Sequence, residues 1–229
     1  MTAPVPAASP WRQSLEAARA NLIPGLVLQA FALAVVLAYY NHEPTRAGLD
    51  SLAAFKTRWG WSYSLLATSL FGGLIPFLYL RGSLATRAAT PFSHGVFFVL
   101  FWAMKGVEVD MFYRFQGWLF GEGVDMKTIA CKLAVDQFVY SIIWSTPTTM
   151  LAFFWKDAGF SFARLWRLAW IPFLREHMPK TVIGLWGVWI PAVTIIYSLP
   201  AALQIPLFNI VLCFYALLFA ALSRRNADV

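Results

Sequence analysis

Two long apolar runs that contain charged residues constrain the fold of this chain most. They extend over residues 95–120 and 131–155, and each is long enough to cross a bilayer, which takes a helix of about 20 mostly apolar residues. Their ionisable and strongly polar residues are Lys105, Glu108, Asp110, Arg114, Asp136 and Gln137. One ionisable group in hydrocarbon costs about 2.5–3.5 kcal/mol, so we expect these side chains to face a bundle interior or water. The two runs therefore predict helices organised around a polar core.

The composition indicates a polytopic helical membrane protein. Hydrophobic residues make up 59% of the 229 residues and charged residues only 13%, whereas soluble domains carry about 25% charge. The formal net charge is +7, but the basic residues lie between the apolar runs rather than in one patch. This placement argues against a nucleic-acid partner and for contact with a lipid bilayer.

Six membrane spans are expected in one all-α transmembrane bundle over residues 22–222. Their ranges are about 22–40, 61–80, 95–116, 131–155, 181–200 and 205–222. A polar loop is expected from Asn41, and the sequence around Gly72, Gly73 and Pro76 predicts a kink or a close helix contact. Residues 1–21 are interpreted as a loosely ordered N-terminus with a short surface helix, and residues 223–229 as a C-terminal tail. Lys and Arg are more numerous on the side of both termini, which places the termini on the inner side of the membrane.

The segment FSFARLWRLAWIPFLREHMPK, residues 160–180, predicts a helix that lies in the membrane interface between the fourth and fifth spans. Helical spacing places Trp166 and Trp170 on an aromatic face and Arg164 and Arg167 on a basic face. A seventh span is the alternative interpretation. It is disfavoured because the arginines and Glu176 would be costly in lipid.

The spacing of the charges in the third span predicts two ion pairs. Lys105 and Glu108 are three residues apart, and Asp110 and Arg114 are four apart, so the members of each pair are neighbours on a helix. Lys105 lies about 15 Å along the helix from Gly95, close to mid-membrane. Polar groups of this kind either line a water-filled path or only hold helices in register. The position of Lys105 and Glu108 favours the path, and both alternatives stay open for the other groups.

No catalytic, cofactor or metal site is expected from the sequence. His42, His94 and His177 lie outside the expected spans, and no motif of a metalloprotease, a serine hydrolase or a phosphate-binding loop occurs. Cys131 and Cys213 lack the spacing of a metal or redox motif. They are predicted to be packed, inert thiols, unless the fold brings them together as a redox pair.

Several short motifs occur in the order Gly106, the pair Phe112–Tyr113, Gly121, Lys127, Lys132 and the pair Asp136–Gln137. Over about residues 63–222, this order resembles the family of the Mpv protein of the mitochondrial inner membrane and the twenty-two-kilodalton peroxisomal membrane protein. In that family a glycine precedes an aromatic pair, and a short basic loop leads into a helix that starts with Asp-Gln. The run LWGVWIPAVTIIYSLP, with Trp189 and Pro191, is similar to the family's Trp-Pro-Ala-Val segment. Ile142 and Ile190 depart from the family pattern.

The resemblance implies a small channel or pore that passes small solutes or ions across a membrane. The polar core residues of the third and fourth spans would line its path, within one bundle or between copies in a homo-oligomer. A non-conducting scaffold that organises lipid or partner proteins is the alternative. A bacterial cytoplasmic membrane is the favoured location, with a mitochondrial inner or peroxisomal membrane as alternatives.

Overall fold

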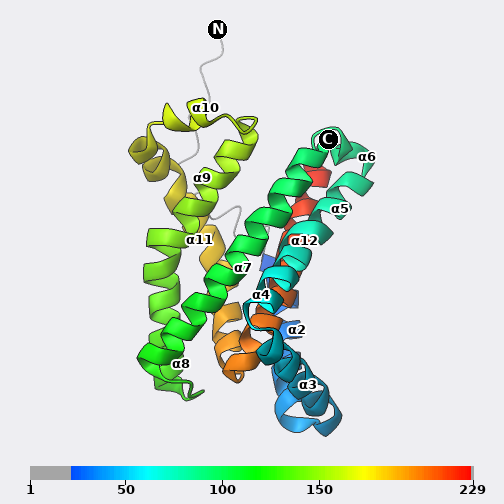
Figure 1. Ribbon diagram of the computed structural model, residues 1–229, viewed down its shortest axis with the longest axis vertical. Coiled ribbons are helices and arrows are strands. Elements are labelled where there is room, and N and C mark those ends of the chain that lie inside the picture. Colours follow the sequence, from blue (N-terminus) through cyan, green and yellow to red (C-terminus); the bar gives the residue numbers. More distant parts are fainter. Residues whose placement is uncertain (1–21, 228–229) are drawn as a thin grey trace. The chain divides into compact units, whose positions relative to one another are not determined.

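The computed structural model describes residues 22–227, which are helical almost throughout and contain no strand. The all-α class is therefore confirmed for this part of the chain, and the surface helix expected within residues 1–21 lies outside it. The elements are α2 (Leu22–Asn41), α3 (Glu43–Trp59), α4 (Trp61–Thr68), η1 (Ser69–Leu74), α5 (Ile75–Gly82), α6 (Leu84–Arg87), α7 (Phe92–Phe120), α8 (Met126–Ala134), η2 (Val135–Ser145), α9 (Thr146–Asp157), α10 (Phe162–Trp166), α11 (Trp170–Tyr197) and α12 (Ala201–Ala227) (Figure 1).

Three helical stretches among residues 22–227 are long and apolar enough to cross a bilayer. They are Trp61–Gly82, Trp170–Tyr197 and Ala201–Leu218. A fourth results if Gly25–Asn41 and Glu43–Trp59, which are bent by 103° at their junction, count as one broken span. Several large apolar side chains in these stretches are exposed, such as Leu66 at 57% and Ile171 at 65%. These helices are compatible with insertion into a membrane.

The polar loop expected from Asn41 is wrong, because the segment forms the helix α3. Pro44 lies in its first turn, where a missing N–H is harmless, and Glu43 and Arg58 complement the helix dipole at opposite ends. Gly60, at a φ of 52°, ends the helix in a conformation that favours glycine. Strong start and stop signals thus produce a helix in a segment of low hydrophobicity.

The predicted interruption of the second span is confirmed as the π-helical segment η1. Its glycines, Gly72 and Gly73, are buried, and Pro76 follows in the first turn of α5. The second π-helical segment, η2, likewise ends just before a proline, Pro147. A proline lacks the N–H that would donate to the preceding turn, and a wider π turn is one way for a helix to adjust there.

The described chain divides into two compact units. The larger one, here called the α7 unit, contains residues 27–133 and 192–227. In it α7 packs along α4 and η1, while α12 packs against α3, α5 and η1 (Figure 1). This packing brings polar side chains of α3 and α4 against α7.

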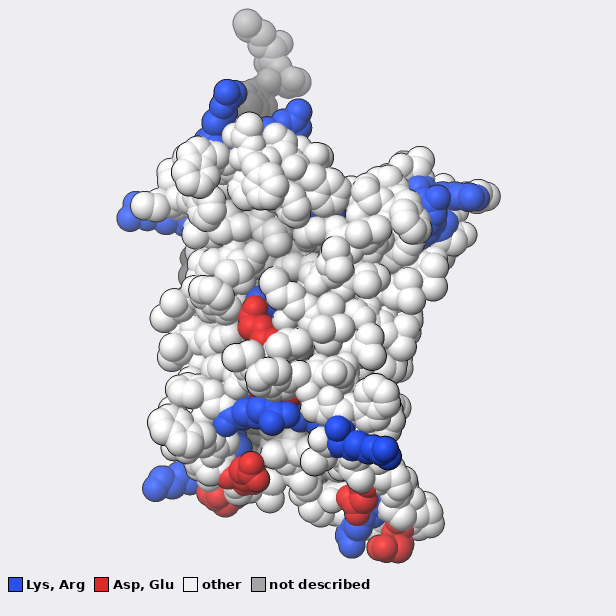
Figure 2. Space-filling model, viewed as in Figure 1, with Lys and Arg blue, Asp and Glu red and all other residues white. Residues whose placement is uncertain are grey.

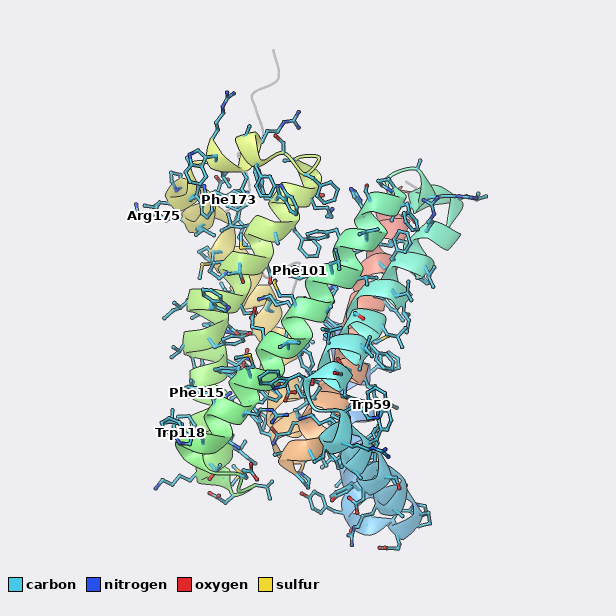
Figure 3. All side chains as sticks on the ribbon, viewed as in Figure 1. Trp59, Phe101, Phe115, Trp118, Phe173 and Arg175 are labelled. Carbon is cyan, nitrogen blue, oxygen red and sulfur yellow. The ribbon has the colours of Figure 1, made fainter. Side chains whose placement is uncertain are left out.

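The smaller unit, here called the η2 unit, contains residues 22–26 and 134–191. The indole Nε1 of Trp186 on α11 donates to the backbone oxygen of Gln137 on η2 at 3.2 Å. The rings of Phe154 on α9 and Phe173 on α11 lie 5.5 Å apart (Figure 3). The segment expected as one interfacial helix over residues 160–180 is divided here. It forms α10, a break at Leu168 and Ala169, and the beginning of the long helix α11.

Candidate functional site

A buried acid, Asp110, is the centre of a polar cluster that joins three helices of the α7 unit. Its Oδ1 accepts hydrogen bonds from Lys56 Nζ on α3 at 3.0 Å and from Arg114 Nε at 3.2 Å. Its Oδ2 accepts from the Ser64 hydroxyl on α4 at 2.7 Å. Asp110 is 1% exposed and Lys56 7%. The predicted ion pair Asp110–Arg114 is confirmed. The sequence did not predict Lys56, which is the buried partner of the same carboxylate.

Because it is buried, the Asp110 cluster has a structural role in helix packing. Two charges removed from water are stable only when their geometry is good and the remaining lone pairs accept hydrogen bonds. Both oxygens of Asp110 accept hydrogen bonds, and the side chain of its cationic partner Lys56 is buried. Arg114, by contrast, keeps 53% of its side chain exposed. The cluster therefore fixes α3, α4 and α7 against each other and leaves little of Asp110 for a solute.

The second predicted pair, Lys105–Glu108, is confirmed and lies in a different environment. Lys105 Nζ donates to Glu108 Oε1 at 2.8 Å, with the lysine side chain 4% and the glutamate side chain 21% exposed. Lys105 Nζ also lies 6.0 Å from the ring centre of Phe101, one turn earlier on α7 (Figure 3). On the face drawn in Figure 2, most charged side chains lie near helix ends, and the surface between them is largely uncharged. A partly exposed ion pair near the middle of a long helix is therefore unusual.

Three further buried polar contacts continue the α7 unit's polar side. Thr68 on α4 donates to Asn209 Oδ1 on α12 at 2.7 Å. Gln116 Nε2 on α7 donates to the Tyr197 hydroxyl at 2.7 Å. Gln204 Nε2 donates to the backbone oxygen of Leu199 at 3.0 Å. Polar contacts of this kind set the register of packed helices.

Lys132 on α8 is a buried cation, 2% exposed, in the same unit. Its Nζ lies 5.9 Å from the ring centre of Tyr197 at the end of α11. An ammonium above an aromatic face is stabilised by the ring's negative charge distribution. Lys127, five residues earlier on the same helix, is exposed. The two lysines of this predicted basic loop thus have opposite environments.

Asp136 and Gln137 lie on η2, and both are buried. Gln137 Nε2 donates to Asp136 Oδ1 at 2.8 Å. The backbone oxygen of Gln137 accepts the Trp186 hydrogen bond described above, and Phe138 stacks edge-on against the same indole at 5.0 Å. The two residues thus hold α11 in the η2 unit. Their predicted place beside a path stays a prediction.

The residues that carry the family resemblance lie mostly at close helix contacts. Gly106 is buried on α7, where an added Cβ would lie 2.3 Å from the backbone oxygen of Ser64. Tyr113 is buried against Tyr197, with ring centres 5.1 Å apart, whereas Phe112 is partly exposed. Trp189 and Pro191 are partly buried on α11, which continues through the proline. These positions explain a need for small and aromatic residues in helix packing.

The four residues predicted to meet the lipid interface are all exposed. Arg164 and Trp166 lie on α10, Arg167 caps its end, and Trp170 begins α11. Trp166 is 86% exposed. Because the helix breaks after α10, these side chains do not share the two continuous faces that one helix would give them.

Cys131 and Cys213 are free thiols, both partly buried. Within residues 22–227, no three His, Cys, Asp or Glu side chains are grouped so as to hold a metal ion.

Sequence reasoning missed several members of the polar side of the α7 unit. They are Lys56, Ser64, Thr68, Gln116 and Asn209. Lys56 lies in a segment interpreted as a loop. The serine, the threonine and the amides carry no charge, so nothing marked them as costly in lipid. The signal that was available is the helical spacing of Ser64 and Thr68, four residues apart and on one face.

Comparison with protein-family models, curated proteins and solved structures found no match to this chain.

Proposed function

We propose that this protein is an integral membrane channel or pore that passes small solutes or ions, with the Lys105–Glu108 pair beside the path. The proposal includes six spans, of which α7 and the run α8–η2–α9 are the polar pair. It also includes two predictions made from the sequence, that both termini lie on the inner side of the membrane and that the chain is related to the family it resembles.

The observation that supports the proposal is the environment of Lys105 and Glu108. At 1.5 Å per residue, α7 is about 43 Å long and Lys105 lies near its middle. Asp110 is buried and forms an ion pair with the buried Lys56, whereas the Glu108 side chain is 21% exposed. An ionisable group at mid-membrane is stable where it meets a partner and water. The pair therefore suits a water-filled path better than a contact with lipid.

The test is single-channel current from the purified full chain in planar bilayers, with a salt gradient that reports ion selectivity. Glu108→Gln removes a negative charge from the path and should move the reversal potential toward anion permeation. Lys105→Met should move it in the opposite direction. Glu43→Gln is the matched control, because that glutamate side chain is 80% exposed at the start of α3.

Opposite shifts for the two α7 variants with an unchanged control support the path. Silence of the folded wild-type protein at every voltage overturns the channel, and equal currents in all variants remove Lys105 and Glu108 from its path.

A second candidate function, a non-conducting scaffold that holds lipid, is supported by the exposed side chains of α10. Phe162 is 70% exposed and Trp166 86%, beside the exposed Arg164 and Arg167. Aromatic rings next to arginines favour the headgroup region of an anionic bilayer. Replacement of Arg164 and Arg167 by Gln should remove a preference for phosphatidylglycerol over phosphatidylcholine, measured by native mass spectrometry of bound lipid. A preference that survives the double substitution counts against the scaffold.

A further inference from the structure

Two buried polar side chains beside Tyr197 lack the partners that burial normally requires. The Lys132 side chain is buried, yet it makes no hydrogen bond or ion pair with another residue of the described chain. Gln116 is 0% exposed, and its Oε1 has no hydrogen-bond partner among the same residues. A buried charge or carbonyl oxygen without a partner loses its hydration with no compensation. Two such groups beside one tyrosine make this place a candidate binding site.

Both groups contact the same ring. Lys132 Nζ lies 5.9 Å from the centre of the Tyr197 ring, and Gln116 Nε2 donates to the Tyr197 hydroxyl at 2.7 Å. Tyr197 itself is 1% exposed. Glu122, an acid of the connection before α8, is exposed and forms no ion pair with Lys132 among the described residues. An ammonium and an acceptor oxygen therefore both lie beside one buried tyrosine, and the ammonium forms no ion pair with Glu122.

We propose that Lys132 and Gln116 bind a small oxyanion that carries a hydroxyl group, the class to which hydrogencarbonate and hydrogen phosphate belong. The charged oxygens of such an anion accept from Lys132 Nζ, and its hydroxyl donates to Gln116 Oε1. Charge-assisted hydrogen bonds of this type are the strong ones. Nitrate and chloride satisfy the lysine but have no proton for the glutamine oxygen.

The position of the site gives it a place in the channel proposed above. Gln116 lies in the last turns of α7, and Lys132 lies two turns into α8, beyond the connection at Gly121–Asp125. An anion site at the end of α7 would make small oxyanions the solutes that enter the path, and that link rests on the proposed function. Binding itself does not require conduction, so it is measured without a current.

The experiment follows the unfolding temperature of the purified full chain in detergent by intrinsic fluorescence. Sodium hydrogencarbonate, phosphate, nitrate and chloride are titrated at equal pH and ionic strength. A ligand that binds only the folded state raises the unfolding temperature with its concentration. We expect larger, saturable increases with hydrogencarbonate and phosphate than with nitrate or chloride. A response to hydrogencarbonate also distinguishes a free anion from a lipid phosphate.

The matched variants are two lysines of one helix. Lys132→Met should abolish the anion response and raise the unfolding temperature in its absence, because the substitution removes an unpaired buried charge. Lys127→Met, at the exposed lysine of α8, should keep the wild-type response. Gln116→Leu should keep a response to anions but lose the preference for those with a hydroxyl.

An identical anion response in wild type and Lys132→Met overturns the site. So does a folded wild-type protein whose unfolding temperature responds to none of the four anions. Should Lys132→Met not fold, Gln116→Leu decides alone, since an unchanged ratio between the hydrogencarbonate and nitrate responses contradicts the proposal.

Discussion

At the scale of single residues, the Asp110 carboxylate shows how burial determines the amount by which an ion pair stabilises the protein. Asp110 Oδ1 accepts from both Lys56 and Arg114, at 3.0 and 3.2 Å. The lysine side chain is 8% exposed and the arginine side chain 53%. Solvent screens the Arg114–Asp110 pair but not the Lys56–Asp110 pair. Two ion pairs of similar distance therefore stabilise the protein by different amounts.

Asp110→Asn should therefore destabilise the protein strongly. The substitution leaves the Lys56 ammonium buried without a counter-ion, which costs about 3–5 kcal/mol in comparable sites. Arg114→Gln is the control and should cost less than about 1 kcal/mol, as for exposed pairs. Unfolding by sodium dodecyl sulfate in mixed micelles measures both free energies. Equal losses in the two variants would show that the Lys56 contact does not dominate.

Much of this residue-level chemistry was predictable, up to the point where tertiary contacts decide it. The intervals Lys105–Glu108 and Asp110–Arg114 predicted two ion pairs because helix geometry is local. The partnership of Asp110 with Lys56 spans 54 residues, so no local rule could propose it. The sequence indicated which helix needs partners, and only packing showed which helices supply them.

At the scale of elements, the contact between α4 and α7 depends on Gly106. A Cβ at this position would lie 2.3 Å from the Ser64 backbone oxygen and 2.6 Å from Thr68 Cβ. Backbone cannot move aside as a flexible side chain does. The small residue therefore allows the two helices to approach and Ser64 to reach Asp110.

Gly106→Ala should separate α4 from α7 and cost about 1–3 kcal/mol of stability, as for other overpacked sites. Gly117→Ala on the same helix is the matched control, because its Cβ would meet Glu122 at an ordinary 3.6 Å. That variant should be neutral or gain up to about 1 kcal/mol from the higher helix propensity of alanine. The same detergent titration separates the two signs, and a destabilised Gly117→Ala would contradict this reading.

The elements also show why the expected boundaries differ from the observed ones. Low hydrophobicity predicted a loop from Asn41, and the spacing of aromatic and basic residues predicted one helix over residues 160–180. Pro44 and Gly60 mark the beginning and the end of α3, and the non-helical residues Leu168 and Ala169 separate α10 from α11. Capping and breaking signals act over two or three residues, and averaging over a span-length window hides them.

At the scale of the whole molecule, the number of spans determines which side of the membrane each segment faces. Six spans with inner termini place residues 41–60 outside and residues 81–94 inside. In a background with Cys131 and Cys213 replaced by Ser, Ser51→Cys should react with a membrane-impermeant maleimide added to intact cells. Ser93→Cys should react only after the membrane is opened. Both serines are exposed in the structure, so a lack of access would reflect the membrane. Labelling of both from one side would contradict six spans.

The two π-helical segments also alter how the faces of these helices relate along the chain. Each residue of a π turn advances the rotation less than the roughly 100° of an α-helix. Over the eleven residues of η2 this difference in rotation accumulates. The side chains of α9 therefore point in directions that a helical wheel continued from α8 would not predict. Faces assigned from an unbroken 3.6-residue period are therefore out of phase beyond Ser145. A one-residue deletion within η2 would shift that phase for every side chain of α9 while leaving its sequence intact.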